Sequence, residues 1–222
     1  MKTLSLMLFL AMSVAISGAA QTGNVDYVLD LVTYPWSSIE ETNSLGPLSS
    51  GIGGGTTGNG VRPLPIDIVL RPLGRSIYET GDDLIFEVVL ENIGNETVVL
   101  PWSPDYGVFR RPEERARTGF TEGGLSLELR DSSGKRRLAW TGMIALFGSP
   151  SRAGSLQALA PGEKALVRAA GTLHLSDGEW REIQAVAPDG KLVAYGMFFI
   201  TGFPITRSDD GVEFIIRDRL RR

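Results

Sequence analysis

Residues 84–91 read Leu-Ile-Phe-Glu-Val-Val-Leu-Glu and are followed directly by Asn92-Ile93-Gly94-Asn95. Every second position is apolar, namely Leu84, Phe86, Val88 and Leu90. A period of two places alternate side chains on opposite faces of a β-strand, so this stretch predicts a strand with one buried face. The Asn- and Gly-containing turn and the β-branched segment 97–100, halted by Pro101, complete the pattern of a β-hairpin.

The same pattern of short apolar or alternating segments separated by turns continues to the C-terminus. Turn residues such as Asp131-Ser132-Ser133-Gly134 and Pro188-Asp189-Gly190 separate short apolar or alternating segments, and long helical periodicity is absent. We expect about seven strands, beginning near Ile66, Leu84, Thr97, Leu125, Lys164, Lys191 and Val212. This number favours an all-β fold, an immunoglobulin-like antiparallel β-sandwich with long inserted loops. A jelly roll or a small second subdomain stays open as an alternative.

Three long connections enlarge this sandwich: Arg110 to Gly124, Arg136 to Ala160 and Gly171 to Pro188. Two short helices are possible within them, over Pro112 to Arg117 and over Ser176 to Ala187, where Ser176 and Glu179 match a capping box. Because loops on a rigid scaffold often carry function, these connections are where we expect contacts with a partner.

Several of these segments carry a family resemblance. They are Gly81 to Asn92, Thr97 to Pro101, Leu127 to Asp131 before Gly134-Lys135, and Leu159 to Glu163. Together they resemble bacterial immunoglobulin-like modules, and among these the Bacillus intracellular proteinase-inhibitor type. The resemblance implies a β-sandwich and, as a function, inhibition of a protease. It contains no reactive-loop motif, so it assigns no inhibitory residue.

The N-terminus has the features of a secretory signal peptide. Lys2 precedes an apolar stretch, residues 4–16, and small residues occupy positions 17–20. An uncleaved anchor is the alternative, but about 13 residues are fewer than the roughly 20 that a spanning helix needs. We therefore expect residues 1–20 to be removed and the protein to be secreted or periplasmic, in a bacterial setting, without a membrane-spanning segment after cleavage.

The mature chain divides into two parts. We expect residues 21–62 to form an N-terminal arm and Gly-rich linker, with one possible strand over Asp26 to Thr33, and residues 63–222 to form the sandwich. Gly53, Gly55 and Gly58 match a dinucleotide fingerprint in form only, because the residues that follow cannot open a helix. No cofactor is expected.

The net charge and the absence of cysteine limit the classes of partner and of metal site that we expect. The formal net charge is -4, which disfavours nucleic acid as a partner, and the chain has no cysteine, so disulfides, thiolate metal sites and a lipid-modified cysteine are excluded. Local basic clusters, such as the one containing Arg110 and Arg111, are either solvated loops or a patch for an acidic partner.

The sequence offers few combinations of residues that could perform catalysis. His174 is the only histidine, so a multi-histidine metal site is impossible, and no serine lies in a Gly-x-Ser-x-Gly elbow. Acidic turns such as Asp82-Asp83 and Asp209-Asp210 could gather around calcium, although ordinary turn chemistry explains them. We expect no catalytic residues and no metal ligands.

Tryptophans supply the remaining candidates. Trp102 is expected to pack on the core, whereas Trp140 and Trp180, with Arg110 and Arg111, are candidate partner-binding residues. The sequence thus predicts an exported, noncatalytic binding or accessory module that contacts a protein at the cell envelope. The alternatives are a proteinase inhibitor and a carbohydrate-binding module that binds a polysaccharide.

Overall fold

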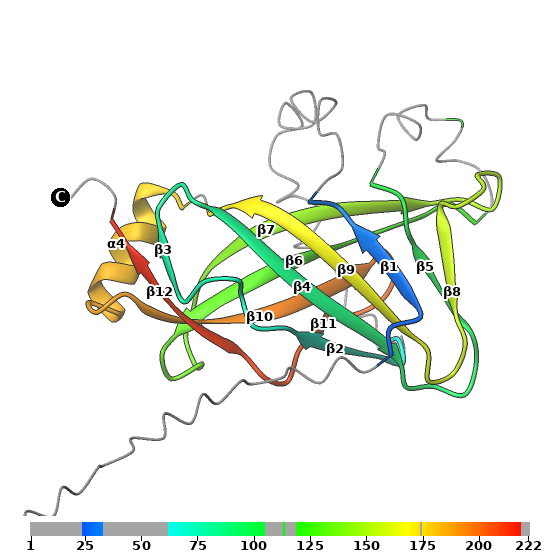
Figure 1. Ribbon diagram of the computed structural model, residues 1–222, viewed down its shortest axis with the longest axis horizontal. Coiled ribbons are helices and arrows are strands. Elements are labelled where there is room, and N and C mark those ends of the chain that lie inside the picture. The colour runs from blue at the N-terminus through cyan, green and yellow to red at the C-terminus, as the bar shows by residue number, and fades with distance from the viewer. Residues whose placement is uncertain (1–23, 33–61, 105–112, 114–118, 174, 219–222) are drawn as a thin grey trace, which may run out of the picture.

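The computed structural model describes residues 24–32, 62–104, 113, 119–173 and 175–218. Within these residues the chain forms twelve strands and one helix, and two larger sheets pack face to face (Figure 1). The predicted all-β sandwich is confirmed. All seven predicted strands are present, but the described chain holds five more.

The first sheet has four strands in the order β1-β9-β4-β2. Their bounds are Tyr27–Asp30 for β1, Lys164–Thr172 for β9, Asp83–Asn92 for β4 and Ile66–Leu70 for β2. The pairs β9/β4 and β4/β2 are antiparallel, whereas β1 runs parallel to β9.

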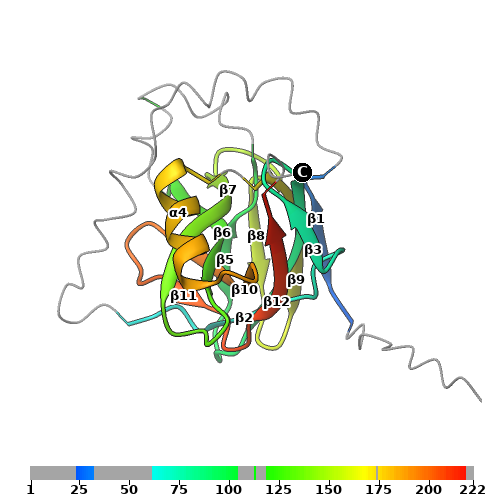
Figure 2. The ribbon, with the colours of Figure 1, turned by 90° about the vertical axis from the view of Figure 1, so that its left-hand side faces the viewer.

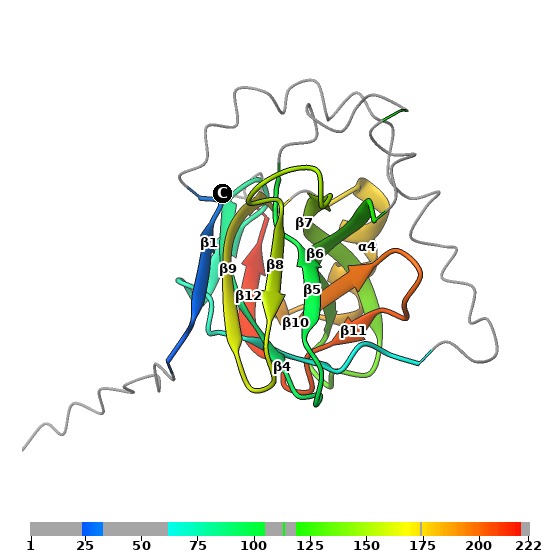
Figure 3. The same ribbon diagram turned by 90° about the vertical axis from the view of Figure 1, so that its right-hand side faces the viewer.

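The second sheet follows the order β3-β12-β10-β6-β7. Its strands are β3 (Ile77–Glu79), β12 (Val212–Arg217), β10 (Lys191–Ile200), β6 (Thr121–Asp131) and β7 (Arg137–Gly148). The two-residue strand β11 (Thr206–Arg207) also pairs with β10, and β3 runs parallel to β12. A separate pair, β5 (Val98–Pro101) and β8 (Leu156–Leu159), lies at the end of the sandwich opposite the helix (Figures 1 and 3).

The core lies between the two sheets and is filled by the inward-facing residues of alternating strands. The predicted inner face of β4 is at most 1% exposed at Leu84, Phe86, Val88 and Leu90. Leu125, Leu127 and Leu129 of β6 are fully buried on the opposing side. Burying these side chains supplies about 1.5–3 kcal/mol each, which is the main stabilising contribution in a chain without disulfides.

The N-terminal boundary of the sandwich differs from the prediction. The expected strand in residues 26–33 forms as β1, but it belongs to the first sheet instead of to an arm before it. The N–H of Leu31 donates to the carbonyl oxygen of Arg168 (2.8 Å), and the Leu31 side chain is fully buried. Residues 1–23 and 33–61, including the predicted signal peptide and the Gly-rich linker, lie outside the described residues.

The predicted connection over residues 136–160 was wrong, because it contains β7 and β8. The segment 138–147 is almost entirely apolar, and without alternation a periodicity argument does not distinguish a strand from a buried loop. The β6/β7 pairing also shifts register twice, between Leu125 and Leu127 and between Leu129 and Arg130. In addition, β6 begins at Thr121, four residues before its predicted start.

The connection over residues 171–188 contains the predicted helix. Helix α4 spans Asp177–Val186, and the capping box is formed by Ser176 and Glu179. The helix lies at one end of the sandwich, where Ile183 is 1% exposed (Figure 2). Within the described residues, no helix is long and apolar enough to cross a membrane. The other possible helix, over residues 112–117, lies outside the described residues apart from residue 113.

Candidate functional site

The outer face of the second sheet carries a cluster of arginines and aromatic rings. The strand register aligns Val193 with Arg130, and it aligns Tyr195 with Glu128, which in turn faces Trp140 on β7. Because alternate residues share a face, these side chains point away from the core. We call this surface the arginine–aromatic face, and it consists of Glu128, Arg130, Arg137, Trp140, Tyr195 and Arg207.

Guanidinium groups lie against both aromatic rings of this face. The guanidinium carbons of Arg130 and Arg207 are 5.4 and 5.1 Å from the ring centroid of Tyr195. The guanidinium carbon of Arg137 is 5.4 Å from the ring centroid of Trp140. These distances are within the range of cation–π attraction, which holds each guanidinium on its ring.

The buried carboxylate of Glu128 anchors the centre of the face. Glu128 is 4% exposed and accepts from Nε of Arg130 at 2.5 Å, while Nη1 of Arg130 donates to the carbonyl oxygen of Gly134 at 2.9 Å. Breaking such a pair from one side leaves a buried charge without compensation, so Arg130 is held firmly. Arg137 and Arg207 are exposed, which leaves two guanidinium groups facing solvent at the edges of the face.

The turn between β6 and β7 lies against the Tyr195 side chain, and this contact requires glycine at position 134. Gly134 has a φ of 69°, and a Cβ at this position would lie 2.6 Å from the Tyr195 hydroxyl oxygen. Asp131 accepts from the Ser133 hydroxyl (2.7 Å) and from the N–H of Lys135 (3.1 Å). The hydrogen bond from Ser133 is the main cause that lowers the pKa of Asp131, and bonds from the turn backbone act in the same direction.

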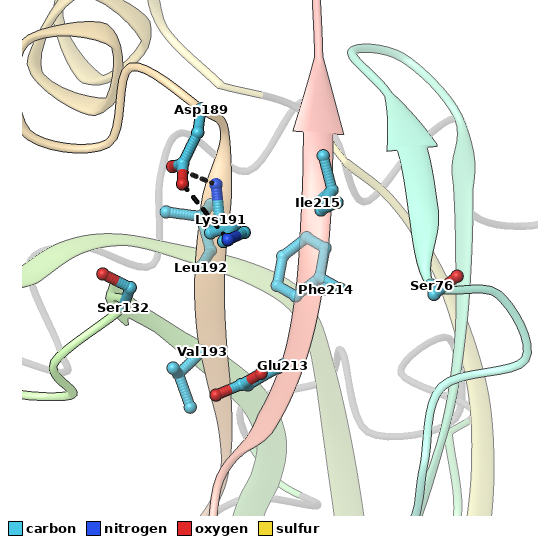
Figure 4. Close-up of a pocket in the computed structure, with 9 residues that line it drawn as sticks. All are labelled: Ser76, Ser132, Asp189, Lys191, Leu192, Val193, Glu213, Phe214 and Ile215. Carbon is cyan, nitrogen blue, oxygen red and sulfur yellow. Dashed lines mark hydrogen bonds and ion pairs between the residues drawn. The ribbon is translucent and has the colours of Figure 1, made fainter.

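A pocket of about 450 Å³, whose lining residues are drawn in Figure 4, adjoins this face. Val193 links the two, because it lines the pocket and is the register partner of Arg130. The Lys191 ammonium lies 3.6 Å from the Asp189 carboxylate, and the second carboxylate in the pocket belongs to Glu213. The other lining residues are Ser76, Ser132, Leu192, Phe214 and Ile215. The surface is thus divided into a basic part with aromatic rings and a pocket with an excess of acid.

The candidate residues that the structure describes lie in different environments. Trp140 lies on the arginine–aromatic face and is half-buried. Trp180 packs against the core from α4 and lines a second pocket of about 240 Å³, so its ring contributes to closing the sandwich. Trp102 also packs against the core, as predicted. Arg110 and Arg111 lie outside the described residues, as do Trp36 and His174.

The acidic turns use their carboxylates for local hydrogen bonds. A carboxylate oxygen of Asp82 accepts from the N–H of Glu79 (2.9 Å), and Asp189 accepts from the N–H of Lys191 (3.1 Å). In the part of the chain that the structure describes, no group of three or more His, Cys, Asp or Glu side chains is arranged to hold a metal ion.

Comparisons with known proteins give no family. No protein-family model matches this chain, and no curated protein sequence matches it. Similar solved structures include the sporulation control protein Spo0M from Bacillus subtilis, with 11% identity, a TM-score of 0.32 and coverage of 69% of this chain and 49% of that chain. The alkylpurine DNA glycosylase AlkC from Pseudomonas fluorescens is 11% identical, with a TM-score of 0.34 and coverage of 70% and 31%. A β-glucosidase from Listeria innocua is 14% identical, with a TM-score of 0.30 and coverage of 69% and 16%. The chain spans less than half the length of each of these proteins. Similarities this weak do not indicate a function.

Sequence reasoning missed the assembly of Arg130, Tyr195 and Arg207. In the sequence, Glu128 and Arg130 alternate with leucines in residues 125–130, whereas the segment around Tyr195 is apolar at nearly every position. The pairing of β6 with β10 joins residues more than 60 positions apart, and no local pattern specifies that register.

Proposed function

We propose that this chain is an exported, noncatalytic binding module that contacts an acidic segment of a protein partner at the cell envelope through the arginine–aromatic face. The observation that carries the proposal is the position of Tyr195, whose ring has the guanidinium groups of Arg130 and Arg207 at 5.4 and 5.1 Å. The face carries three guanidinium groups and one carboxylate, whereas the whole chain has a net charge of -4. This local basic charge favours a partner with carboxylates.

The chemistry of the face suits a protein partner. Arginine binds carboxylates through paired N–H donors, and Arg, Tyr and Trp are the residues that dominate the energetics of protein interfaces. The side chains are held on adjacent strands, and Arg130 is fixed by Glu128 and Gly134 before any partner arrives. A preorganised surface loses less side-chain entropy on binding.

The same geometry favours a protein over a polysaccharide. Sugar rings stack on open aromatic faces, but guanidinium groups already lie over the rings of Tyr195 and Trp140. A carboxylate can reach the outer N–H groups of Arg137 and Arg207 without displacing these contacts, since both arginines are exposed.

A glutamate-rich peptide of about twelve residues tests the proposal in solution. We expect it to change the tryptophan fluorescence of the mature protein, with an affinity that falls as salt is added. Replacing Arg137 or Arg207 by Ala should weaken binding about threefold to tenfold, since an accessible charged contact contributes roughly 0.5–1.5 kcal/mol. Arg152→Ala, which removes an exposed arginine from the connection between β7 and β8, is the matched control and should leave the affinity unchanged.

Two results would contradict the proposal. One is the absence of binding at low salt; the other is an equal loss in the Arg152→Ala control. Protease inhibition, which the family resemblance implies, stays a separate prediction that a panel of serine, cysteine and metalloproteases would test.

A further inference from the structure

An apolar row crosses the outer face of the first sheet. The register aligns Val28 of β1 with Leu166 of β9, Leu166 with Val89 of β4, and Val89 with Val69 of β2. The two ends of this row are open to solvent, because Val28 is 61% and Val69 is 48% exposed. Outward-facing positions of a sheet are usually polar when that face meets solvent, so a line of four aliphatic side chains there is unusual.

Charged side chains border this apolar row on both sides. The first charged row runs in strand order through Asp30, Arg168, Glu87 and Arg71. The Arg168 guanidinium lies 3.5 Å from the carboxylates of both Asp30 and Glu87. The Arg71 guanidinium lies 3.3 Å from the Glu87 carboxylate. Its signs alternate from one edge of the sheet to the other.

The second charged row runs through Asp26, Lys164, Glu91 and Asp67. Within it, the Lys164 ammonium lies 2.8 Å from the Glu91 carboxylate. The apolar row is thus enclosed between two ladders of ionic residues whose positions are set by strand register.

The order of these charges is self-complementary about one particular axis. A two-fold axis in the plane of the face and parallel to the strands exchanges the first and last strand positions of two facing copies. Asp30 then faces Arg71 of the other copy, Arg168 faces Glu87, and Lys164 faces Glu91. Only Asp26 and Asp67 bring like charges together. The apolar row meets its own reverse, so that Val28 faces Val69 and Leu166 faces Val89.

The other in-plane axis gives the opposite result. A two-fold axis across the strands exchanges the two charged rows, which places Arg168 on Lys164, Glu87 on Glu91 and Asp30 on Asp26 of the other copy. Three of the four charge positions are then repulsive. Of these two arrangements, the charges favour the one about the axis parallel to the strands.

We propose that this face docks onto a second copy of the same chain about the axis parallel to the strands. Four strands spaced about 4.8 Å apart and about five residues long give a contact of roughly 300 Å² per copy. A stable interface usually buries about 800 Å² per partner, so this association is weak and populated at high local protein concentration. It would present two arginine–aromatic faces, one on each outer side of the pair.

Single cysteines test the arrangement directly, because the chain contains none of its own. Val28→Cys and Val69→Cys are prepared as separate variants of the mature protein and mixed at equal, high concentration with a short bis-maleimide. Facing sheets pack about 10 Å apart, which a short linker spans. We expect the mixture to give a cross-linked dimer at least fivefold more than either variant alone.

The control is Val99→Cys, which places a cysteine at a 50% exposed position on β5, a strand that pairs with β8 and not with a strand of the first sheet. Equal cross-linking of Val28→Cys alone and of the mixture would overturn the proposed axis. A yield no greater than that of Val99→Cys, or failure of both variants to react with a monofunctional maleimide, would overturn the docking face itself.

A charge exchange provides an independent readout. The double variant Lys164→Glu/Glu91→Lys keeps an ion pair between positions 91 and 164 within each chain, and it keeps the pairing between two copies of itself. It opposes like charges when it meets the unaltered chain. We expect the exchange on one cross-linking variant to lower the yield at least twofold and the exchange on both to restore it. An unchanged yield in the mismatched pair would contradict the charge registry.

Discussion

Asn92→Ala is expected to destabilise the sandwich strongly because Asn92 ties three backbone segments together. Its side chain is fully buried, and its Nδ2 donates to the carbonyl oxygens of Glu96 and Leu159, both at 2.8 Å. Its Oδ1 accepts from the N–H of Gly94 at 2.9 Å. The residue thereby holds the β4–β5 turn against the end of β8.

The magnitude follows from what each partner does after the change. The buried carbonyl oxygen of Leu159 loses the Asn92 donor, and the loss of this buried hydrogen bond together with the space left by the fully buried side chain costs about 1–3 kcal/mol. The groups of Glu96 and Gly94 lie in a partly exposed turn, where water replaces the lost bond at a cost of about 0.5–1 kcal/mol each. We expect a total loss of about 3 kcal/mol, measured as a shift of the urea midpoint at constant slope.

The matched control is Asn95→Ala in the same turn. Asn95 is exposed, so its replacement should change the free energy of unfolding by less than about 0.5 kcal/mol. Asn92→Asp should be nearly as harmful as Asn92→Ala, because an ionised carboxylate cannot donate to the two carbonyls. A loss below about 1 kcal/mol for Asn92→Ala would show that the side chain of Asn92 does not hold the turn against the buried Leu159 carbonyl.

Four further outcomes are expected. Leu31→Ala should lower the free energy of unfolding by about 3–5 kcal/mol, since the side chain is fully buried in the core; a change under about 1 kcal/mol would show that β1 is not part of the folded unit. Gly134→Ala should cost about 1–2 kcal/mol in urea unfolding, because its φ is 69° and the added methyl would meet the Tyr195 hydroxyl. Above the unfolded-state pKa of its carboxyl group, Asp131 stabilises the folded protein, and this stability is lost as the pH falls through the lowered pKa of the folded state. Asp131→Asn should therefore make the acid limb of the pH–stability curve shallower. Ser176→Ala should reduce stability by about 1 kcal/mol through loss of the helix cap, and an unchanged thermal midpoint would argue against the capping box.

The strands with clear alternation could be predicted from the sequence, because their polar and apolar positions report a half-buried surface. Leu84 to Leu90 form the clearest case, and their burial follows the predicted face. The capping box of α4 was also recognisable, since Ser176 and Glu179 are close in sequence and their hydrogen bonds are local. Segment 137–148 lacked this information, since its nearly continuous apolar run hides which face is buried.

The candidate site depended on contacts that no local pattern encodes. Trp140 was selected for its residue type, but its role on the surface depends on Arg137 and on the alignment of β7 with β6. The parallel pairing of β1 with β9 joins residues 138 positions apart, so a strand was predictable there and its sheet was not. Trp180 was selected in the same way, and its partial burial against the core could not be foreseen, because an isolated aromatic residue gives no indication of whether it meets a partner or its own core.

Site-specific photo-cross-linking in cells that naturally carry this chain tests whether the arginine–aromatic face contacts a protein. A photoreactive amino acid replaces Trp140 on the face or Val99 on β5, and the second position is the control. We predict a discrete cross-linked protein from position 140 that disappears when Arg137 and Arg207 are both replaced by Ala. The same products from both positions, or cross-links that persist without the two arginines, would show that this face is not the contact surface.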